Sequence, residues 1–303
     1  MSFLNPVNEP VLRFKSTDAG APQINYNSRT AGDVKAVLKA CLVTGYGAVA
    51  GAGWSIVNEV DHVCEFVSPS VAMSDYRLGI DDSLADKTAF YYMYQDARTN
   101  PTGSHFQNTL ARNLSNIDKT SNFNTWQLLT TDRGFLLIES LLYTKTQKVY
   151  ARVTYFGQLK GVSNQGGQNI SFMVVGGTSY QEPHVAFSND SKPYRHFLLG
   201  GVSSINLTSA VSLAFSETGG INYPSGICIR SNIYLFSGKQ LLGAHPALLM
   251  TMPSEFSAIT GLEDTTVSGR NLLDIPIALL TDYVSHINNS VRVISVFTDY
   301  WEF

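Results

Sequence analysis

The sequence predicts an α+β protein that is mostly β, with antiparallel sheets in a sandwich-like arrangement and one amphipathic helix near the N-terminus. Short runs rich in Val, Ile, Phe and Tyr recur along the chain, and turn residues separate them. Only 15% of the 303 residues are charged. Ser, Thr, Asn, Gly and Tyr replace the missing charge, and this mixture is typical of strands joined by tight turns.

The one helix is expected over residues 34–42. Its apolar residues fall at i, i+3, i+4, i+7 and i+8 and form a single stripe: Val34, Val37, Leu38, Cys41 and Leu42. Thr30 or Gly32 can cap the start, and Asp33 suits the positive end of the helix dipole. Gly45 is placed to end the helix. We expect the stripe to face the core.

Strands are expected wherever apolar runs follow a period of two or form short blocks. Asp132-Arg133-Gly134 joins two such runs and predicts a hairpin. Residues 96–125 are polar and predict a long surface excursion, and residues 254–262 can hold one short helix or turn. The candidate strands are 11–15, 64–67, 76–80, 89–94, 126–130, 134–138, 148–156, 170–175, 227–229, 232–236 and 291–297.

The length predicts a chain divided into subdomains, because single cores rarely grow beyond about 250–300 residues. Residues 1–28 are expected to form an extended N-terminal arm, stiffened by Pro6, Pro10 and Pro22. The arm either packs on a neighbouring subunit or closes the chain's own sheet. An α+β subdomain is expected over residues 29–157 and a β-rich subdomain over 158–303. The turn-rich stretch 157–168 marks the boundary between them.

Charge and cysteine content exclude several classes of function. The net charge of −3 comes without a cluster of Lys and Arg, so direct nucleic-acid binding is not expected. The N-terminus has no apolar leader, and no apolar run approaches the length of a membrane span, so we expect no membrane association and synthesis in a reducing cytoplasm. Cys41, Cys64 and Cys228 lack metal or disulfide spacing and are expected to be small buried hydrophobes.

No catalytic, cofactor-binding or metal-binding residues are predicted. The glycines of 45–53 follow the helix, whereas a phosphate loop precedes one. Asp81 and Asp82 are adjacent on a strand, so they point to opposite faces and predict a strand-end turn. None of the six histidines has the spacing of a zinc pair, and solvated or hydrogen-bonded side chains are expected for His62, His105, His184, His196, His245 and His286. We therefore expect a protein that is not an enzyme.

Tyr91, Tyr92 and Tyr94 give an alternative binding function. Aromatic side chains gathered on an exposed face could stack against the faces of a host surface glycan. Alternation along any half-buried strand would also expose some of them.

The opening of the chain resembles a family of structural proteins of tailed-bacteriophage virions. The resemblance is most specific in an F-x-S-x-D-x-G-A-P segment beginning at Phe14 and in a second segment over residues 36–47. The second segment reads Ala36-Val37-Leu38-Lys39-Ala40-Cys41-Leu42-Val43-Thr44-Gly45-Tyr46-Gly47 and is followed by Ala52-Gly53-Trp54. Lys39 departs from the family pattern, in which Asp is common, and so does the stretch 96–125. Weaker similarity extends to Tyr76-Arg77-Leu78, Asp81-Asp82, residues 133–137, Tyr155-Phe156-Gly157, Gly261-Leu262, residues 269–273, and 293–301 with Asp299 and Trp301.

The resemblance implies a component of a virion tail, baseplate, neck or head decoration, made in the bacterial host and carried in the particle. Copies of the chain and other virion proteins would be its partners, and the family has no catalytic residues to transfer. A tail-associated receptor- or glycan-binding module is the alternative function. A virion-associated depolymerase, with carboxylates drawn from distant loops, is the third.

Overall fold

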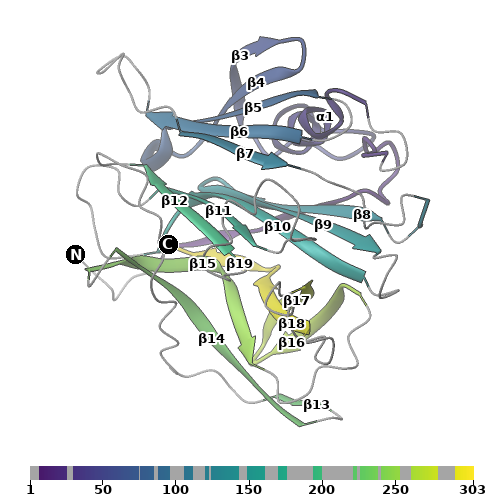
Figure 1. The fold of residues 1–303 in the computed structure, drawn as a ribbon. Helices are drawn as coiled ribbons and strands as arrows, with labels where there is room; N and C mark the ends of the chain where they lie inside the picture. The colour runs from purple at the N-terminus through teal and green to yellow at the C-terminus, as the bar shows by residue number, and fades with distance from the viewer. Residues whose placement is uncertain are drawn as a thin grey trace, which may run out of the picture.

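The computed structural model describes fifteen stretches of the chain (Figure 1). All statements about structure below concern these stretches. They are residues 7–25, 30–74, 76–84, 88–95, 106–111, 120–122, 124–142, 149–160, 170–175, 194–199, 221–223, 226–237, 240–252, 261–278 and 291–303.

Three antiparallel β-sheets form successive layers (Figure 1). The outer sheet has five strands and packs with the short helix α1 (Asp33–Lys39). In spatial order its strands are β3 (Ser55–Val60), β4 (Val63–Val67), β5 (Tyr76–Leu84), β6 (Thr88–Gln95) and β7 (Phe106–Ala111). The expected surface excursion over 96–125 is therefore wrong in part, since β7 lies within it. An edge strand can be polar because only one of its sides joins the ladder.

The middle sheet has six strands and includes both N-terminal and central segments. The expected boundary between residues 157 and 158 falls inside β10, just before its last residue, Gln158. β10 pairs with β11 in this sheet, and the two-subdomain division stays a prediction. The spatial order is β12 (Tyr194–Leu199), β11 (Ile170–Val175), β10 (Val149–Gln158), β9 (Gly134–Leu142), β8 (Thr125–Thr131) and β2 (Leu12–Lys15).

The lower sheet also has six strands, and a separate two-stranded sheet joins the two ends of the chain. That small sheet pairs β1 (Asn8–Pro10) with β19 (Tyr300–Glu302). The spatial order of the lower sheet is β13 (Ile221–Tyr223), β14 (Gly226–Ser237), β15 (Gln240–Met252), β18 (Val291–Phe297), β17 (Arg270–Ala278) and β16 (Glu263–Val267).

The middle sheet is buried on both faces, and β9 shows why its sequence reads as a continuous apolar run. Phe135 and Leu137 belong to the core between the outer and middle sheets. Leu136 and Ile138 belong to the core between the middle and lower sheets. Because successive residues of a strand point to opposite faces, a strand inside a three-layer stack must be apolar on both.

The predicted helix is confirmed, and all five residues of its stripe are buried. It begins at Asp33, and from Ala40 to Thr44 the backbone widens into a π-helical turn. Gly45 ends it with a φ of 74°. The Asp132-Arg133 hairpin is also confirmed, because Thr131 pairs with Gly134 across the turn.

The N-terminal arm is built into the chain's own sheets from Asn8 to Lys15. The arm was expected either to pack on a neighbouring subunit or to close the chain's own sheet. For these residues the structure shows the second arrangement. Residues 1–6 and 26–29 lie outside the described stretches, as do residues 254–260, where a short helix or turn was expected.

Candidate functional site

The two most specific resemblance segments form one packing unit. The carboxylate of Asp18 accepts a hydrogen bond from the Tyr46 hydroxyl at 2.8 Å. Burial and this hydrogen bond raise the pKa of Tyr46 far above its ordinary value, so the phenol remains a donor. The Phe14 and Tyr46 rings lie 6.0 Å apart. A Cβ at Gly47 would lie 2.4 Å from the Ala19 carbonyl oxygen, so only glycine fits between the segments.

The glycine-rich stretch 45–53 completes the end of the helix, as predicted. The backbone N–H of Ala52 donates to the Cys41 carbonyl at 3.0 Å, and that of Trp54 donates to the Leu42 carbonyl at 2.9 Å. These bonds satisfy carbonyls that the end of a helix leaves without intrahelical partners.

Asp82 caps the start of the helix from a distant strand. It is buried, and its Oδ2 accepts hydrogen bonds from the backbone N–H groups of Val34 at 2.7 Å and Lys35 at 3.2 Å. Asp81 accepts the Ser83 N–H instead, at 3.0 Å. The predicted strand-end turn is wrong, because β5 continues through both carboxylates to Leu84. The first N–H groups of the helix have no acceptor within the helix. This need explains why β5 places a carboxylate there.

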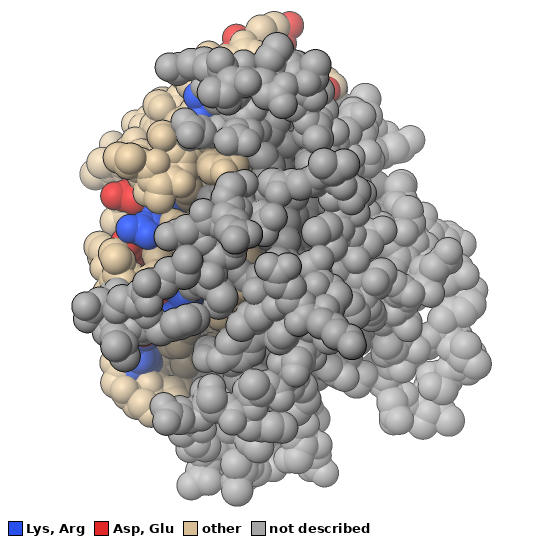
Figure 2. Space-filling view, turned by 90° about the vertical axis from the view of Figure 1, so that its left-hand side faces the viewer, with Lys and Arg blue, Asp and Glu red and all other residues tan. Residues whose placement is uncertain are grey.

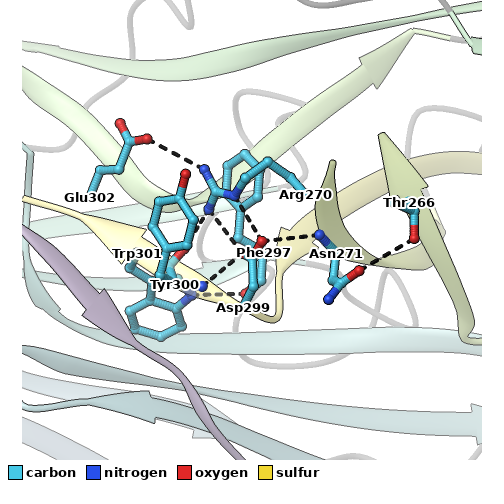
Figure 3. A network of polar contacts seen from close by, with 8 residues as sticks. All are labelled: Thr266, Arg270, Asn271, Phe297, Asp299, Tyr300, Trp301 and Glu302. Carbon is cyan, nitrogen blue, oxygen red and sulfur yellow. Dashed lines mark hydrogen bonds and ion pairs between the residues drawn. The ribbon is translucent and has the colours of Figure 1, made fainter. Parts of the chain in front are cut away.

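A third group of resemblance residues surrounds Arg270 (Figure 3). Its Nε and Nη2 donate to the two carboxylate oxygens of Asp299, at 2.9 and 3.0 Å. Nη2 also donates to the Tyr300 carbonyl at 2.6 Å, and Nη1 lies 3.4 Å from the Glu302 carboxylate. The guanidinium carbon lies 3.3 Å from the centre of the Tyr300 ring and 4.0 Å from that of Phe297. We call these five residues the Arg270 clamp.

The Arg270 clamp fixes the ionisation of Asp299. Partial burial alone would raise the pKa of Asp299, but hydrogen bonds from Arg270, Tyr300 and Asn271 outweigh burial and hold it below its ordinary value. The backbone N–H groups of Tyr300 and Asn271 lie 2.7 and 3.1 Å from the carboxylate. A charged Asp299 therefore ties β17 to the chain's last strand.

Three exposed valines lie on the β3–β4 hairpin and in the turn that follows it. Val57 is 51% exposed, Val60 60% and Val71 90%. Val57 lies at a bulge in β3, and Val60 pairs with Val63 across the hairpin. We call Val57, Val60 and Val71 the hairpin valines. No strand was expected over residues 55–60, because the bulge interrupts the alternation of side chains there.

Glu59, which lies between Val57 and Val60, is already paired within the chain. The Glu59 carboxylate forms ion pairs with Lys35 at 2.8 Å and with Lys39 at 2.9 Å. The hydrogen bonds from Lys35 and then Lys39 lower the pKa of Glu59. β3 is an edge strand in the described part of the sheet, and its one carboxylate meets two ammonium groups.

The predicted roles of Cys41, Cys64 and His245 are confirmed. Cys41 and Cys64 are buried, and burial raises the pKa of both thiols, to about 11 for Cys64. His245 is buried, and its Nδ1 accepts backbone N–H groups of Ala247 at 3.1 Å and Leu248 at 3.0 Å. The side chains of Cys228 and His196 lie outside the described part, as do His105, His184 and His286 altogether.

The tyrosines proposed for glycan binding lie on β6. Tyr91 pairs with Ile80, Tyr92 with Gly79 and Tyr94 with Arg77 in the ladder between β6 and β5. Their side chains lie outside the described part of the structure, and the glycan interpretation stays a prediction.

Charged side chains of both signs are visible along the described strip of the face in Figure 2. Within the described stretches, no three His, Cys, Asp or Glu side chains gather as metal ligands. No helix in those stretches has the length and apolar character to cross a membrane.

Neither a family model, nor a curated protein, nor a solved structure matches the chain.

Proposed function

We propose that this chain is a structural component of a tailed-bacteriophage particle, acting by association with copies of itself and with other particle proteins. The resemblance of the opening segments supports this proposal. So does the role of the resemblance residues, because Asp18, Tyr46, Asp82, Arg270 and Asp299 all bond to other parts of the same chain. The segments that carry the resemblance therefore help to hold the chain's own fold together.

The hairpin valines are the single observation that carries the proposed function. Three valines between 51% and 90% exposed lie within residues 57–71, on an edge strand and the turn after its partner. Fully burying one valine side chain is worth about 1.5–3 kcal/mol. A partner that covers two or three of them gains several kcal/mol, and the paired Glu59 adds no uncompensated charge to the contact.

The proposal places the protein in the tail, baseplate, neck or head surface of the particle after synthesis in the host cytoplasm. No chemistry on a substrate is required of it. Its work is mechanical: apolar surface is buried between copies or partners, and polar residues around the contact set the register.

The test is a double variant, Val57→Thr with Val60→Thr, which keeps side-chain shape and strand propensity. Particles assembled with the variant are purified on a density gradient, and the chain is measured by quantitative mass spectrometry. We expect incorporation to fall at least about tenfold, because two desolvated valine contacts are lost.

The matched control is Val49→Thr, an exposed valine outside the hairpin, which should leave incorporation unchanged. Equal incorporation of the double variant, at wild-type melting temperature, would show that the hairpin valines are not a contact surface.

A further inference from the structure

The two ends of the chain form a small sheet of their own. Asn8, Glu9 and Pro10 of β1 pair with Glu302, Trp301 and Tyr300 of β19. Backbone bonds extend this ladder at both ends: Val7 and Phe303 exchange two bonds of 3.0 Å, and the Val11 N–H donates to the Asp299 carbonyl at 2.9 Å. No other described strand pairs with β1.

The segments on either side of the β1 ladder are anchored in the cores. Trp301 is buried in the core between the middle and lower sheets, and its Nε1 donates to the Phe297 carbonyl at 2.9 Å. The Arg270 clamp fixes Asp299 just before β19 (Figure 3). Phe14 holds β2 in the other core. β19 and β2 therefore both have anchors that do not involve β1.

β1 itself lies at the surface. Val7 is 46% exposed, and Asn8 and Pro10 are exposed as well. Besides the backbone ladder, β1 is fastened by an ion pair between Glu9 and Arg133, at 2.5 Å. The second carboxylate oxygen of Glu9 is buried and has no hydrogen-bond partner in the described structure, which lowers the net gain of seating the strand.

We propose that β1 is an exchangeable strap: it leaves the β19 of its own chain and pairs with the β19 of a second copy. Val11 alone separates β1 from β2, and Pro10 stiffens the segment before this hinge. Every contact of the closed strap, including Glu9 with Arg133, can form identically between two chains. Exchange then costs little apart from the entropy lost on association. That entropy is already lost when copies are held together in a particle. This inference rests on the proposed function, because it requires copies held together.

A disulfide trap distinguishes the two arrangements. Asn8→Cys and Glu302→Cys place thiols on directly paired residues of β1 and β19, at a separation that antiparallel neighbours can bridge. The pair is made in a Cys228→Ser background, since Cys41 and Cys64 are buried. Assembled protein is oxidised and separated by denaturing electrophoresis without reductant.

We expect covalent dimers and longer multimers, which collapse to single chains on reduction. The two single-cysteine variants should give no multimers longer than a dimer. Because Glu302 also contacts Lys160 and Arg270, the pair Val7→Cys with Phe303→Cys provides a second trap that leaves those ion pairs intact.

Disulfides formed only within single chains, in both trapped pairs and in assembled particles, would overturn the exchange. The proposed function would survive that result, since the chain would still be present in the particles. Absence of the chain from purified particles would overturn the proposed function instead.

Discussion

Arg270 shows how one side chain gathers the last residues of the chain. Its guanidinium donates to both oxygens of Asp299 and to the Tyr300 carbonyl, while its faces contact the Tyr300 and Phe297 rings. Such a planar fork is a property of Arg that Lys lacks. Arg270 and Asp299 lie 29 positions apart, so the sequence gives no direct sign of this pairing.

Asp299→Asn should destabilise the protein in a pH-dependent way. The pKa of Asp299 is lowered in the folded state, so its contribution is present above the unfolded pKa of about 3.9 and disappears as pH falls through the folded pKa. At pH 7 the variant should lose about 1.5–3 kcal/mol of unfolding free energy. The difference from wild type should shrink as the pH is lowered from about 5 toward 2.

Chemical denaturation at a series of pH values measures this effect. Asp264→Asn is the control, since that carboxylate is 62% exposed and its ion pair with Arg13 should contribute less than about 1 kcal/mol. A constant difference between Asp299→Asn and wild type across the whole pH range would contradict the role given to Asp299.

Cys41 and Cys64 should resist alkylation in the native protein. Burial raises the pKa of both thiols, with the charges of Asp18 and Glu59 adding to it, so little thiolate is present at pH 8. Mass spectrometry after iodoacetamide treatment should find both residues unmodified in buffer and alkylated in denaturant. Rapid native alkylation of either residue would show that its surroundings open to solvent.

Among the elements, the helix and its glycine-rich exit are the most strongly specified. Leu38→Ala should cost about 2–5 kcal/mol, because Leu38 is fully buried in the core between the outer and middle sheets. Ala36→Ser, on the exposed side of the same helix, should change stability by no more than about 0.5 kcal/mol. Thermal and denaturant melts measure both, and equal melting curves for Leu38→Ala and wild type would refute this placement.

Gly47 and Gly53 form a matched pair that isolates the contact between the two resemblance segments. Both have positive φ, 54° and 82°, so an alanine at either position costs about 1–2 kcal/mol for its backbone conformation. Only at Gly47 would the new Cβ meet the Ala19 carbonyl, whereas nothing lies within 4 Å at Gly53. We expect Gly47→Ala to lose about 1–3 kcal/mol more than Gly53→Ala.

Denaturant melts of the two alanine variants, analysed side by side, give this difference directly. Equal losses would mean that the F-x-S-x-D-x-G segment does not press against the G-Y-G segment.

The sequence predicts secondary-structure elements that have a clear hydrophobic period. It does not predict contacts that depend on residues far away in the chain. The helical stripe and the Asp132-Arg133 hairpin could be predicted because local spacing determines them. β3, β7 and β19 could not, since a bulge, a polar edge and a three-residue length conceal their alternation. The sequence also did not show the capping role of Asp82, because the N–H groups that donate to it lie 47 and 48 residues away.

In the whole molecule, the middle sheet is the layer on which the other two pack. Its strands come from residues 12–15 and 125–199, whereas the outer sheet comes from residues 55–111 and the lower sheet from residues 221–297. The prediction of mostly β structure with antiparallel sheets and one short helix is confirmed in the described part. A third layer could not be foreseen, because apolar runs reveal burial on both faces without naming the sheets that cover them.

We propose that this chain is a built-in part of a phage particle. The most direct measurement is its copy number in particles purified by density gradient, washed in high salt and quantified by mass spectrometry against known particle proteins. We expect a fixed number of copies per particle that does not fall on washing, because apolar contacts such as the hairpin valines are not screened by salt. A chain found only in the soluble lysate, or in amounts that vary between preparations and decline with each wash, would contradict the claim.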